Sequence, residues 1–194
     1  MTADCRPPTA EKFAIRPLTS TDIPGIARWV AATPLWQRYN VTEESSAKRL
    51  RDGLGEGATI YVAERAGAVV GFVWLVERGA FNRSGYVQLI GVQPDARNAG
   101  VGRALMQFAE EKIFALGRDL FLLVSDFNAD AQRFYQRLGY RQVGKLDDYV
   151  VPGVSELIFC KRTADDAMLD VGSHAHNNLA VLGIRDNQIS RALH

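Results

Sequence analysis

A short run of small and cationic residues is the first feature that could do chemistry. It reads Arg97-Asn98-Ala99-Gly100-Val101-Gly102. A strand-like stretch at residues 86–92 precedes it, and apolar residues at helical spacing follow it as far as Gly117. Main-chain N–H groups at a helix start have no partner, and the helix dipole favours negative charge there. The pattern therefore predicts an anion site, with Arg97 and Arg103 as nearby cations.

The spacing excludes two common phosphate-binding loops. A Walker loop needs Gly-x-x-x-x-Gly-Lys-Ser/Thr, which this stretch lacks, and a dinucleotide fingerprint needs a third glycine where Leu105 stands. Two interpretations of the run stay open when it is taken alone. It is either an anion cradle or a helix start whose small residues allow close packing.

A second motif follows the strand-like residues 119–125. It reads Asn128-Ala-Asp-Ala131-Gln-Arg-Phe134-Tyr135-Gln-Arg-Leu138-Gly139-Tyr140. Asn128 is a typical helix N-cap, and Gly139 is typical of a helix end. With the Val-x-Pro strand end and the glycine run before it, this motif resembles the two signatures of the GNAT superfamily of N-acetyltransferases, in the same order. The resemblance covers residues 12–162 and implies the GNAT fold and acetyl-CoA as co-substrate.

The resemblance implies a role for each residue of the CoA site. The pyrophosphate of CoA is expected on the N–H groups of residues 98–102, and the pantetheine arm on the main chain of Ile90 and Val92. The N–H of Val92 is the candidate donor to the thioester carbonyl. Asn98 stands where many relatives have glycine, and asparagine tolerates the positive φ expected there. Further CoA contacts are expected from Asn128, Ala131, Phe134 and Tyr135.

Tyr135 is the candidate general acid. It matches the family tyrosine whose hydroxyl lies near the CoA sulfur. A phenol with a pKa near 10 is protonated at neutral pH and can donate to a thiolate whose thiol has a pKa of about 8.5. The alternative is a core tyrosine on the apolar face of its helix.

A general base is harder to assign. Family members often use a glutamate on the strand that corresponds to residues 86–92. Here, alternation from Val92 predicts a carboxylate-free face that consists of Ile90, Gln88 and Tyr86. Asp126 is our candidate because it follows the next strand, and Glu77 and Glu156 are the alternatives. The acceptor amine could also arrive neutral or lose its proton to water.

Large side chains in predicted connections and on strand faces suggest an acceptor pocket. Half of them could instead fill the core. Arg38 and Arg83 could pair with a carboxylate, so we expect a small amine that carries one. The candidate acceptor residues are Trp36, Arg38, Tyr39, Trp74, Phe81, Arg83 and Tyr149.

Composition limits the remaining possibilities. The 194 residues are 47% hydrophobic and carry 23 basic and 22 acidic side chains, which argues against nucleic acid as a partner. The two cysteines, Cys5 and Cys160, and the close pair His174 and His176 predict neither a disulfide framework nor a metal site. No apolar run resembles a signal core or a membrane span, so we expect a cytoplasmic protein. A homodimer stays open.

The elements that must position these residues form an α/β domain at residues 12–162. We expect a twisted, mixed, mostly antiparallel sheet of six to seven strands with about four helices around it. Residues 1–11 should form a loose arm, and residues 163–194 an extension of unknown role. Thr21 or Ser20 should cap the first helix, Thr42 should begin the second, and Ala66-Gly67 should form a hairpin turn. The aromatic-rich residues 33–39 should connect these two helices.

Three functions fit these patterns. The first is acetyl transfer from acetyl-CoA to a primary amine of a small molecule, directly within a ternary complex. The second is acetylation of peptide N-termini or lysines, which predicts an open groove. The third is a non-catalytic acyl-CoA-binding module, which keeps the glycine run and lacks the acid and the base.

Overall fold

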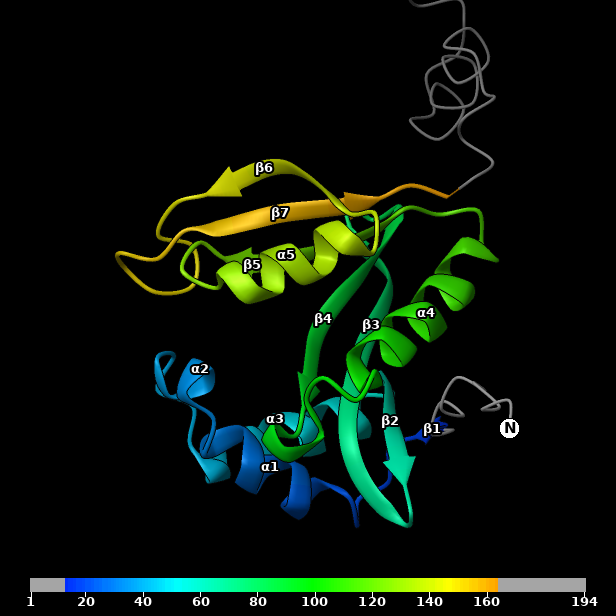
Figure 1. The fold of residues 1–194 in the computed structure, drawn as a ribbon, viewed down its shortest axis with the longest axis vertical. Coiled ribbons are helices and arrows are strands. Elements are labelled where there is room, and N and C mark those ends of the chain that lie inside the picture. Colours follow the sequence, from blue (N-terminus) through cyan, green and yellow to red (C-terminus); the bar gives the residue numbers. More distant parts are fainter. Residues whose placement is uncertain (1–12, 164–194) are drawn as a thin grey trace, which may run out of the picture. The chain divides into compact units, whose positions relative to one another are not determined.

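The computed structural model describes residues 13–163, and Figure 1 shows how their elements are arranged. A seven-stranded sheet has the order β1-β2-β3-β4-β5-β7-β6. All neighbouring strands are antiparallel except β4 and β5, which are parallel. The predicted mixed, mostly antiparallel sheet is confirmed. The strands are β1 (Ala14–Pro17), β2 (Thr59–Arg65), β3 (Ala68–Ala80), β4 (Ser84–Val92), β5 (Leu120–Ser125), β6 (Arg141–Leu146) and β7 (Glu156–Lys161).

Helices lie on both faces of the sheet, each with its own hydrophobic core. On one face are α4 (Val101–Phe114) and α5 (Ala129–Arg137), whose buried residues pack with β4, β5 and β7. On the other are α1 (Ile23–Ala31) and α3 (Glu43–Gly55), which pack over β2 and β3. The parallel pair β4 and β5 lies at the middle of the sheet, between the two layers of helices.

The segment between α1 and α3 contains a short helix, α2 (Pro34–Gln37), where a connection was expected. Thr33 is extended, and Pro34 occupies the first helical position, where its missing N–H costs nothing. Tyr39 follows this helix in a turn, with its N–H donating to the Trp36 carbonyl. The turn after this helix brings the Tyr39 hydroxyl to Ser125 at the end of β5 and Glu156 at the start of β7.

One predicted helix cap is confirmed and one is wrong. Thr42 and Ser45 form a reciprocal capping box at the start of α3. At α1 the N-cap position belongs to Asp22, instead of Thr21 or Ser20. The carboxylate of Asp22 accepts hydrogen bonds from the Arg16 guanidinium at 2.8 and 2.9 Å, which ties β1 to α1.

Three predicted turns are confirmed by positive φ angles. Ala66 and Gly67 join β2 to β3 with φ values of 50° and 78°. Gly117 follows α4 and Gly139 follows α5, with φ values of 63° and 91°. The expectations for the arm at residues 1–11, for Cys5 and for the extension that contains His174 and His176 lie outside the described residues. Among the described helices, none is long and apolar enough to cross a membrane.

Candidate active site

A gap opens in the sheet between β4 and β5. The two strands pair at residues 85–87 of β4 and 120–122 of β5. β4 then continues to Val92 and β5 to Ser125 without further pairing between them. Figure 1 shows the two strands diverging from this point. The gap therefore lies at the carboxyl ends of the parallel pair, as the GNAT resemblance implies.

The main chain at the end of β4 faces this gap. The Gln93 N–H donates to the Val70 carbonyl at 2.9 Å. Hydrogen-bonded and non-hydrogen-bonded pairs alternate along an antiparallel ladder, so the next pair, Gly71 with Val92, is not hydrogen-bonded. The N–H and C=O groups of Val92, and those of Ile90 two residues earlier, therefore point away from β3 and towards the gap.

A β-bulge in β4 precedes this segment. Leu89 and Val87 lie opposite consecutive residues of β3, so Gln88 between them has no cross-strand partner. The extra residue shifts the alternation of side chains between the two faces. The prediction that Tyr86 shares a face with Val92 is therefore wrong. Tyr86 lies on the α3 side of the sheet, where the charge of Arg49 acts on it.

The glycine run forms the turn between β4 and α4. Asn98 and Gly100 have φ values of 62° and 87°, so the predicted positive φ at Asn98 is confirmed. Residues 97–100 are exposed, and no side chain caps α4. Within the described part of the chain, the main-chain N–H groups of residues 98–103 have no hydrogen-bond acceptor. This turn therefore presents a row of free donors at the positive end of a helix dipole.

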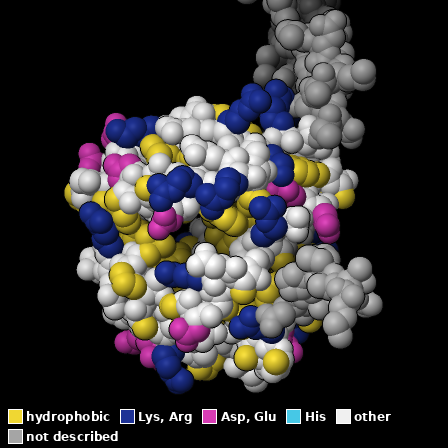
Figure 2. All heavy atoms as spheres, in the orientation of Figure 1, with side chains coloured by type: hydrophobic (Ala, Val, Ile, Leu, Met, Phe, Trp, Pro, Cys, Tyr) yellow, Lys and Arg dark blue, Asp and Glu magenta, His cyan; other side chains and the backbone are white. Residues whose placement is uncertain are grey.

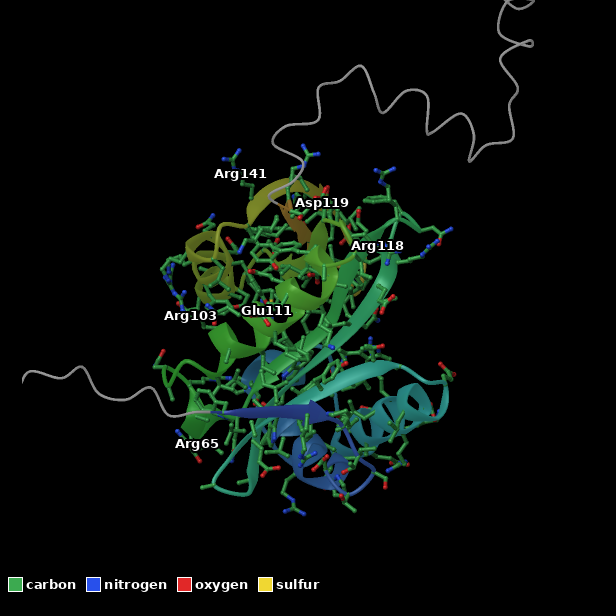
Figure 3. All side chains as sticks on the ribbon, turned by 90° about the vertical axis from the view of Figure 1, so that its right-hand side faces the viewer. Arg65, Arg103, Glu111, Arg118, Asp119 and Arg141 are labelled. Atoms are coloured by element: carbon green, nitrogen blue, oxygen red, sulfur yellow. The ribbon has the colours of Figure 1, made fainter. Side chains whose placement is uncertain are left out.

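Two cations flank the turn. Arg97 precedes it and Arg103 lies in the first turn of α4, and both side chains are exposed. Figure 3 shows Arg103 projecting from this end of α4. Among residues 13–163, no carboxylate pairs with either of them. Both remain available for an anionic ligand.

The separately predicted CoA contacts converge at Gly102. A Cβ atom placed on Gly102 would lie 3.4 Å from Cζ of Phe134 and 3.6 Å from Cγ2 of Val92. The start of α4, the end of β4 and α5 therefore meet at one point. Asn128 caps α5 as predicted, because its Oδ1 accepts the Ala131 N–H at 3.2 Å.

Tyr135 lies in the core beside this point. Its ring packs against Phe134, Tyr140 and Phe159, with centroid distances of 5.1, 5.8 and 6.4 Å. Burial raises the pKa of its hydroxyl above the ordinary value, so the phenol stays protonated. The Tyr140 hydroxyl is sealed from solvent, whereas the Tyr135 hydroxyl is not among the sealed polar atoms. Tyr135 is therefore a core residue with a protonated hydroxyl, and its role as general acid stays a prediction.

A polar cluster that the sequence motifs did not reveal lies at the ends of β5 and β7. The Tyr39 hydroxyl donates to Oε1 of Glu156 at 2.6 Å and also contacts the Ser125 hydroxyl. Glu156 and Ser125 are 4% and 7% exposed. Burial, and next the hydrogen bond to Glu156, raise the pKa of Tyr39 to about 12. The three residues come from distant parts of the chain, so no local spacing could have shown them together.

The predicted acceptor residues do not all lie in one place. Arg38 stacks over the Phe127 ring at 4.0 Å, and Tyr39 contacts the same ring, so both lie near the end of β5. Tyr149 is 62% exposed in the loop between β6 and β7. Trp36 and Trp74 pack against the α1–α3 core.

Phe81 and Arg83 lie elsewhere. They belong to the hairpin between β3 and β4, at the opposite end of β4 from Val92. The Gly85 N–H beside this hairpin donates to the carbonyl of Asp119, which Figure 3 labels at that end of the molecule. The structure therefore places Arg83 near the start of β5 and Arg38 near its end, so the two do not share one site. That either of them pairs with an acceptor carboxylate stays a prediction.

Asp126, the candidate base, is exposed at the end of β5, and its carboxylate contacts the main chain of Ser155. Its Oδ2 accepts the Ser155 N–H at 3.4 Å, and its carbonyl accepts the Gln132 side chain at 2.8 Å.

Figure 2 shows a hollow in the face drawn in Figure 1, with hydrophobic side chains inside and Lys and Arg side chains around it. An apolar hollow with a cationic rim suits a ligand that has an apolar arm and a phosphate group.

The chain matches known proteins over this region. The model of the acetyltransferase (GNAT) family matches residues 26–140. A mycothiol acetyltransferase of Thermobispora bispora is 35% identical over 104 residues, which cover 51% of this chain and 35% of the relative. An uncharacterized N-acetyltransferase of Methanocaldococcus jannaschii is 30% identical over 105 residues, or 53% of this chain and 65% of the relative. The matched regions thus span about a third to two thirds of the length of these relatives.

Solved structures share the fold. An N-acetyltransferase from Staphylococcus aureus Mu50 has a TM-score of 0.64 at 17% identity, over 78% of this chain and 99% of its own. The yncA protein of Salmonella typhimurium, solved with its cofactor acetyl-CoA, has a TM-score of 0.61 at 15% identity, over 82% and 98%. A nourseothricin acetyltransferase has a TM-score of 0.51 at 31% identity, over 55% and 65%. With the family model matched over more than half of its length, this chain belongs to the acetyltransferase (GNAT) family.

Proposed function

We propose that this chain is an N-acetyltransferase that moves an acetyl group from acetyl-CoA to a primary amine of a small molecule. The observation that carries the proposal is the row of free N–H groups at residues 98–103 beside the gap between β4 and β5. A pyrophosphate would satisfy these donors, with Arg97 and Arg103 adding positive charge. Gly100 and Gly102 have no Cβ, so phosphate oxygens can approach the main chain closely.

From this anchor, the pantetheine arm would follow the end of β4. The main-chain groups of Ile90 and Val92 that face the gap are its hydrogen-bonding partners. Phe134 and Ala131 on α5 would border the arm on the other side, since Phe134 and Val92 both lie close to Gly102. A ligand held in this way ends with its thioester in the gap, next to Tyr135.

Two groups would act on the thioester. The Val92 N–H donates to the carbonyl oxygen as it becomes an oxyanion, and a preorganised donor of this kind contributes roughly 3 kcal/mol. Tyr135 donates its hydroxyl proton to the departing sulfur. The low-dielectric surroundings that raise the pKa of Tyr135 also raise the pKa of the CoA thiol, because they disfavour a free thiolate. Proton transfer from Tyr135 to the sulfur therefore stays favourable. Transfer is direct, from thioester to amine within one ternary complex.

The small-molecule acceptor is supported by the relatives. Two mycothiol acetyltransferases and a nourseothricin acetyltransferase, all named for small molecules, are 35%, 32% and 31% identical to this chain over the matched region. The aromatic and charged residues near the end of β5 suit the same class. Tyr39, Arg38 and Tyr149 would line the acceptor side of the gap.

Calorimetry with acetyl-CoA, followed by thiol release across a panel of small amines, tests the proposal. Wild type should bind acetyl-CoA and release thiol with at least one small primary amine. Tyr135→Phe should bind acetyl-CoA as tightly and release thiol about 100-fold more slowly, the usual contribution of a general acid. Acetyl-CoA binding without turnover on small amines, peptides or lysines would favour a non-catalytic acyl-CoA-binding protein. Turnover on peptides alone would favour a protein acetyltransferase.

A further inference from the structure

Glu156 is a carboxylate whose burial the fold alone does not explain. It is 4% exposed at the start of β7, and an unpaired buried charge is costly. Tyr39 satisfies Oε1 with a 2.6 Å hydrogen bond. In the described part of the chain Oε2 has no hydrogen-bond or ion-pair partner, and it is not among the atoms sealed from solvent. One oxygen of a nearly buried carboxylate is therefore open to a ligand.

The register of the sheet places this oxygen on the face opposite α5. Glu156 lies directly beside Ser125, the last residue of β5. Val124 and Phe159 point into the core beneath α4 and α5. Side chains alternate along a strand, so Ser125 and Glu156 point to the other face. Tyr135 and Glu156 thus approach the open end of the β4–β5 gap from opposite sides of the sheet.

We propose that Glu156 binds the ammonium group of the acceptor and takes its proton, with Tyr39 and Ser125 as its positioning residues. This assignment rests on the proposed function. An amine held by Glu156 would enter the gap from the face of the sheet opposite to Tyr135.

The chemistry balances in both protons and bonds. Oε2 of Glu156 receives one proton from the ammonium and later releases it to solvent. The neutral nitrogen then attacks the thioester carbon, a C–N bond forms and the C–S bond breaks. Tyr135 protonates the sulfur, and the second proton lost by nitrogen restores Tyr135. The products are the acetamide, free CoA and one proton.

The surroundings of Glu156 favour a cationic amine with an apolar body. The groups that face it are Tyr39, Ser125 and Tyr86, and the charges of Asp126 and Arg49 act on the same region. Aromatic faces attract cations, and Asp126 adds negative charge. The aromatic ring of Phe127 is already covered by Arg38. The acceptor class is a small primary ammonium ion whose body packs on tyrosine rings.

The test compares Glu156→Gln with wild type at saturating acetyl-CoA, using an amine on which wild type is active. Glutamine keeps the shape and can still accept from Tyr39. At pH 7.5 we expect kcat/KM for the amine to fall about 100-fold, a typical loss for a missing general base. The deficit should shrink as the pH rises towards the pKa of the amine, because the amine then loses its proton to solvent. The Kd for acetyl-CoA should stay within twofold.

Matched variants separate this result from loss of structure. Glu44→Gln removes an exposed carboxylate of α3 and should leave kcat/KM for the amine and Kd for acetyl-CoA unchanged. Tyr39→Phe keeps the carboxylate and removes its hydrogen bond, so kcat/KM for the amine should fall about tenfold, as expected for loss of a hydrogen bond to a charged group. If Glu156→Gln does not fold, the proposal is tested on Tyr39→Phe instead, by kcat/KM for the amine and Kd for acetyl-CoA.

Two outcomes overturn the proposal, and they differ from one another. If Glu156→Gln keeps the kcat/KM and pH profile of wild type, or if Asp126→Asn shows the 100-fold loss instead, Glu156 is not the base. The proposed acetyltransferase activity would then still stand. A wild-type enzyme that binds acetyl-CoA and acetylates no amine would refute the proposed function and the role of Glu156 with it.

Discussion

Gly100→Ala tests the proposed pyrophosphate site at the glycine run, because its expected effects on stability and on acetyl-CoA binding can be measured separately. Gly100 has a φ of 87°, and a Cβ added to it meets nothing within 4 Å. Gly100→Ala therefore creates no clash, and its cost in the free protein comes from the left-handed backbone. That cost is about 1–2 kcal/mol, partly offset by a stiffer unfolded chain. The net loss of about 1 kcal/mol should lower Tm by roughly 2–4 °C.

Gly57 supplies the matched control. It also has a positive φ, of 76°, and open space around it, but it lies in the turn after α3. Gly57→Ala should therefore lower Tm by the same amount and leave acetyl-CoA binding unchanged. Gly100→Ala should in addition weaken acetyl-CoA, because its backbone must relax and its new methyl group stands among the free N–H donors.

The loss of affinity can be estimated from those donors. A hydrogen bond to a charged group is worth about 1.5–3 kcal/mol, so losing one should raise Kd roughly 10- to 100-fold. Differential scanning fluorimetry measures Tm, and isothermal titration calorimetry with acetyl-CoA measures Kd. A Gly100→Ala protein that loses stability as Gly57→Ala does, yet binds acetyl-CoA like wild type, would refute the cradle at residues 98–103.

Three further predictions concern other parts of the molecule. Arg103→Ala should weaken acetyl-CoA about fivefold at low salt and less at high salt, because an exposed cation is screened; calorimetry at two ionic strengths checks this. Tyr135→Phe should leave Tm nearly unchanged in a thermal melt, since no partner within the described residues depends on the Tyr135 hydroxyl. Asp22→Asn should cost about 1–2 kcal/mol at pH 7, because Arg16 lowers the pKa of Asp22 from 3.8 to about 2. That stability is present above pH 3.8 and is lost as the pH falls towards 2, so urea unfolding should show the two proteins converging in acid.

Features set by a few neighbouring residues were predictable from the sequence. The positive φ at Asn98, the box formed by Thr42 and Ser45, and the cap at Asn128 each follow from a short-range preference. The family resemblance added the order of the elements and the gap between β4 and β5. Both cores also follow from apolar spacing along α1 and α4.

Features set by long-range pairing were not predictable. The bulge at Gln88 depends on how β4 matches β3, and it moved Tyr86 to the other face. Asp22 took the N-cap position because Arg16 on β1 holds its carboxylate. Such contacts depend on the assembled sheet, which no local pattern encodes.

The acceptor side shows the same limit. Tyr39 and Glu156 are 117 positions apart in the chain, and they meet because α2 and the β5–β7 pair reach the same place. The type of a side chain indicates that it could wall a pocket, but not which end of a strand it will occupy. Phe81 and Arg83 lie at the far end of β4 for this reason.

The most direct measurement is an amide chemical-shift titration of the isotopically labelled protein with acetyl-CoA. We expect the largest changes at the N–H groups of residues 98–103, which lack acceptors in the free protein, and at Val92. Free CoA should shift residues 98–103 in the same way and Val92 less, because it has no thioester carbonyl. Unchanged amides at residues 98–103, at a concentration that saturates the protein, would contradict the proposed pyrophosphate site.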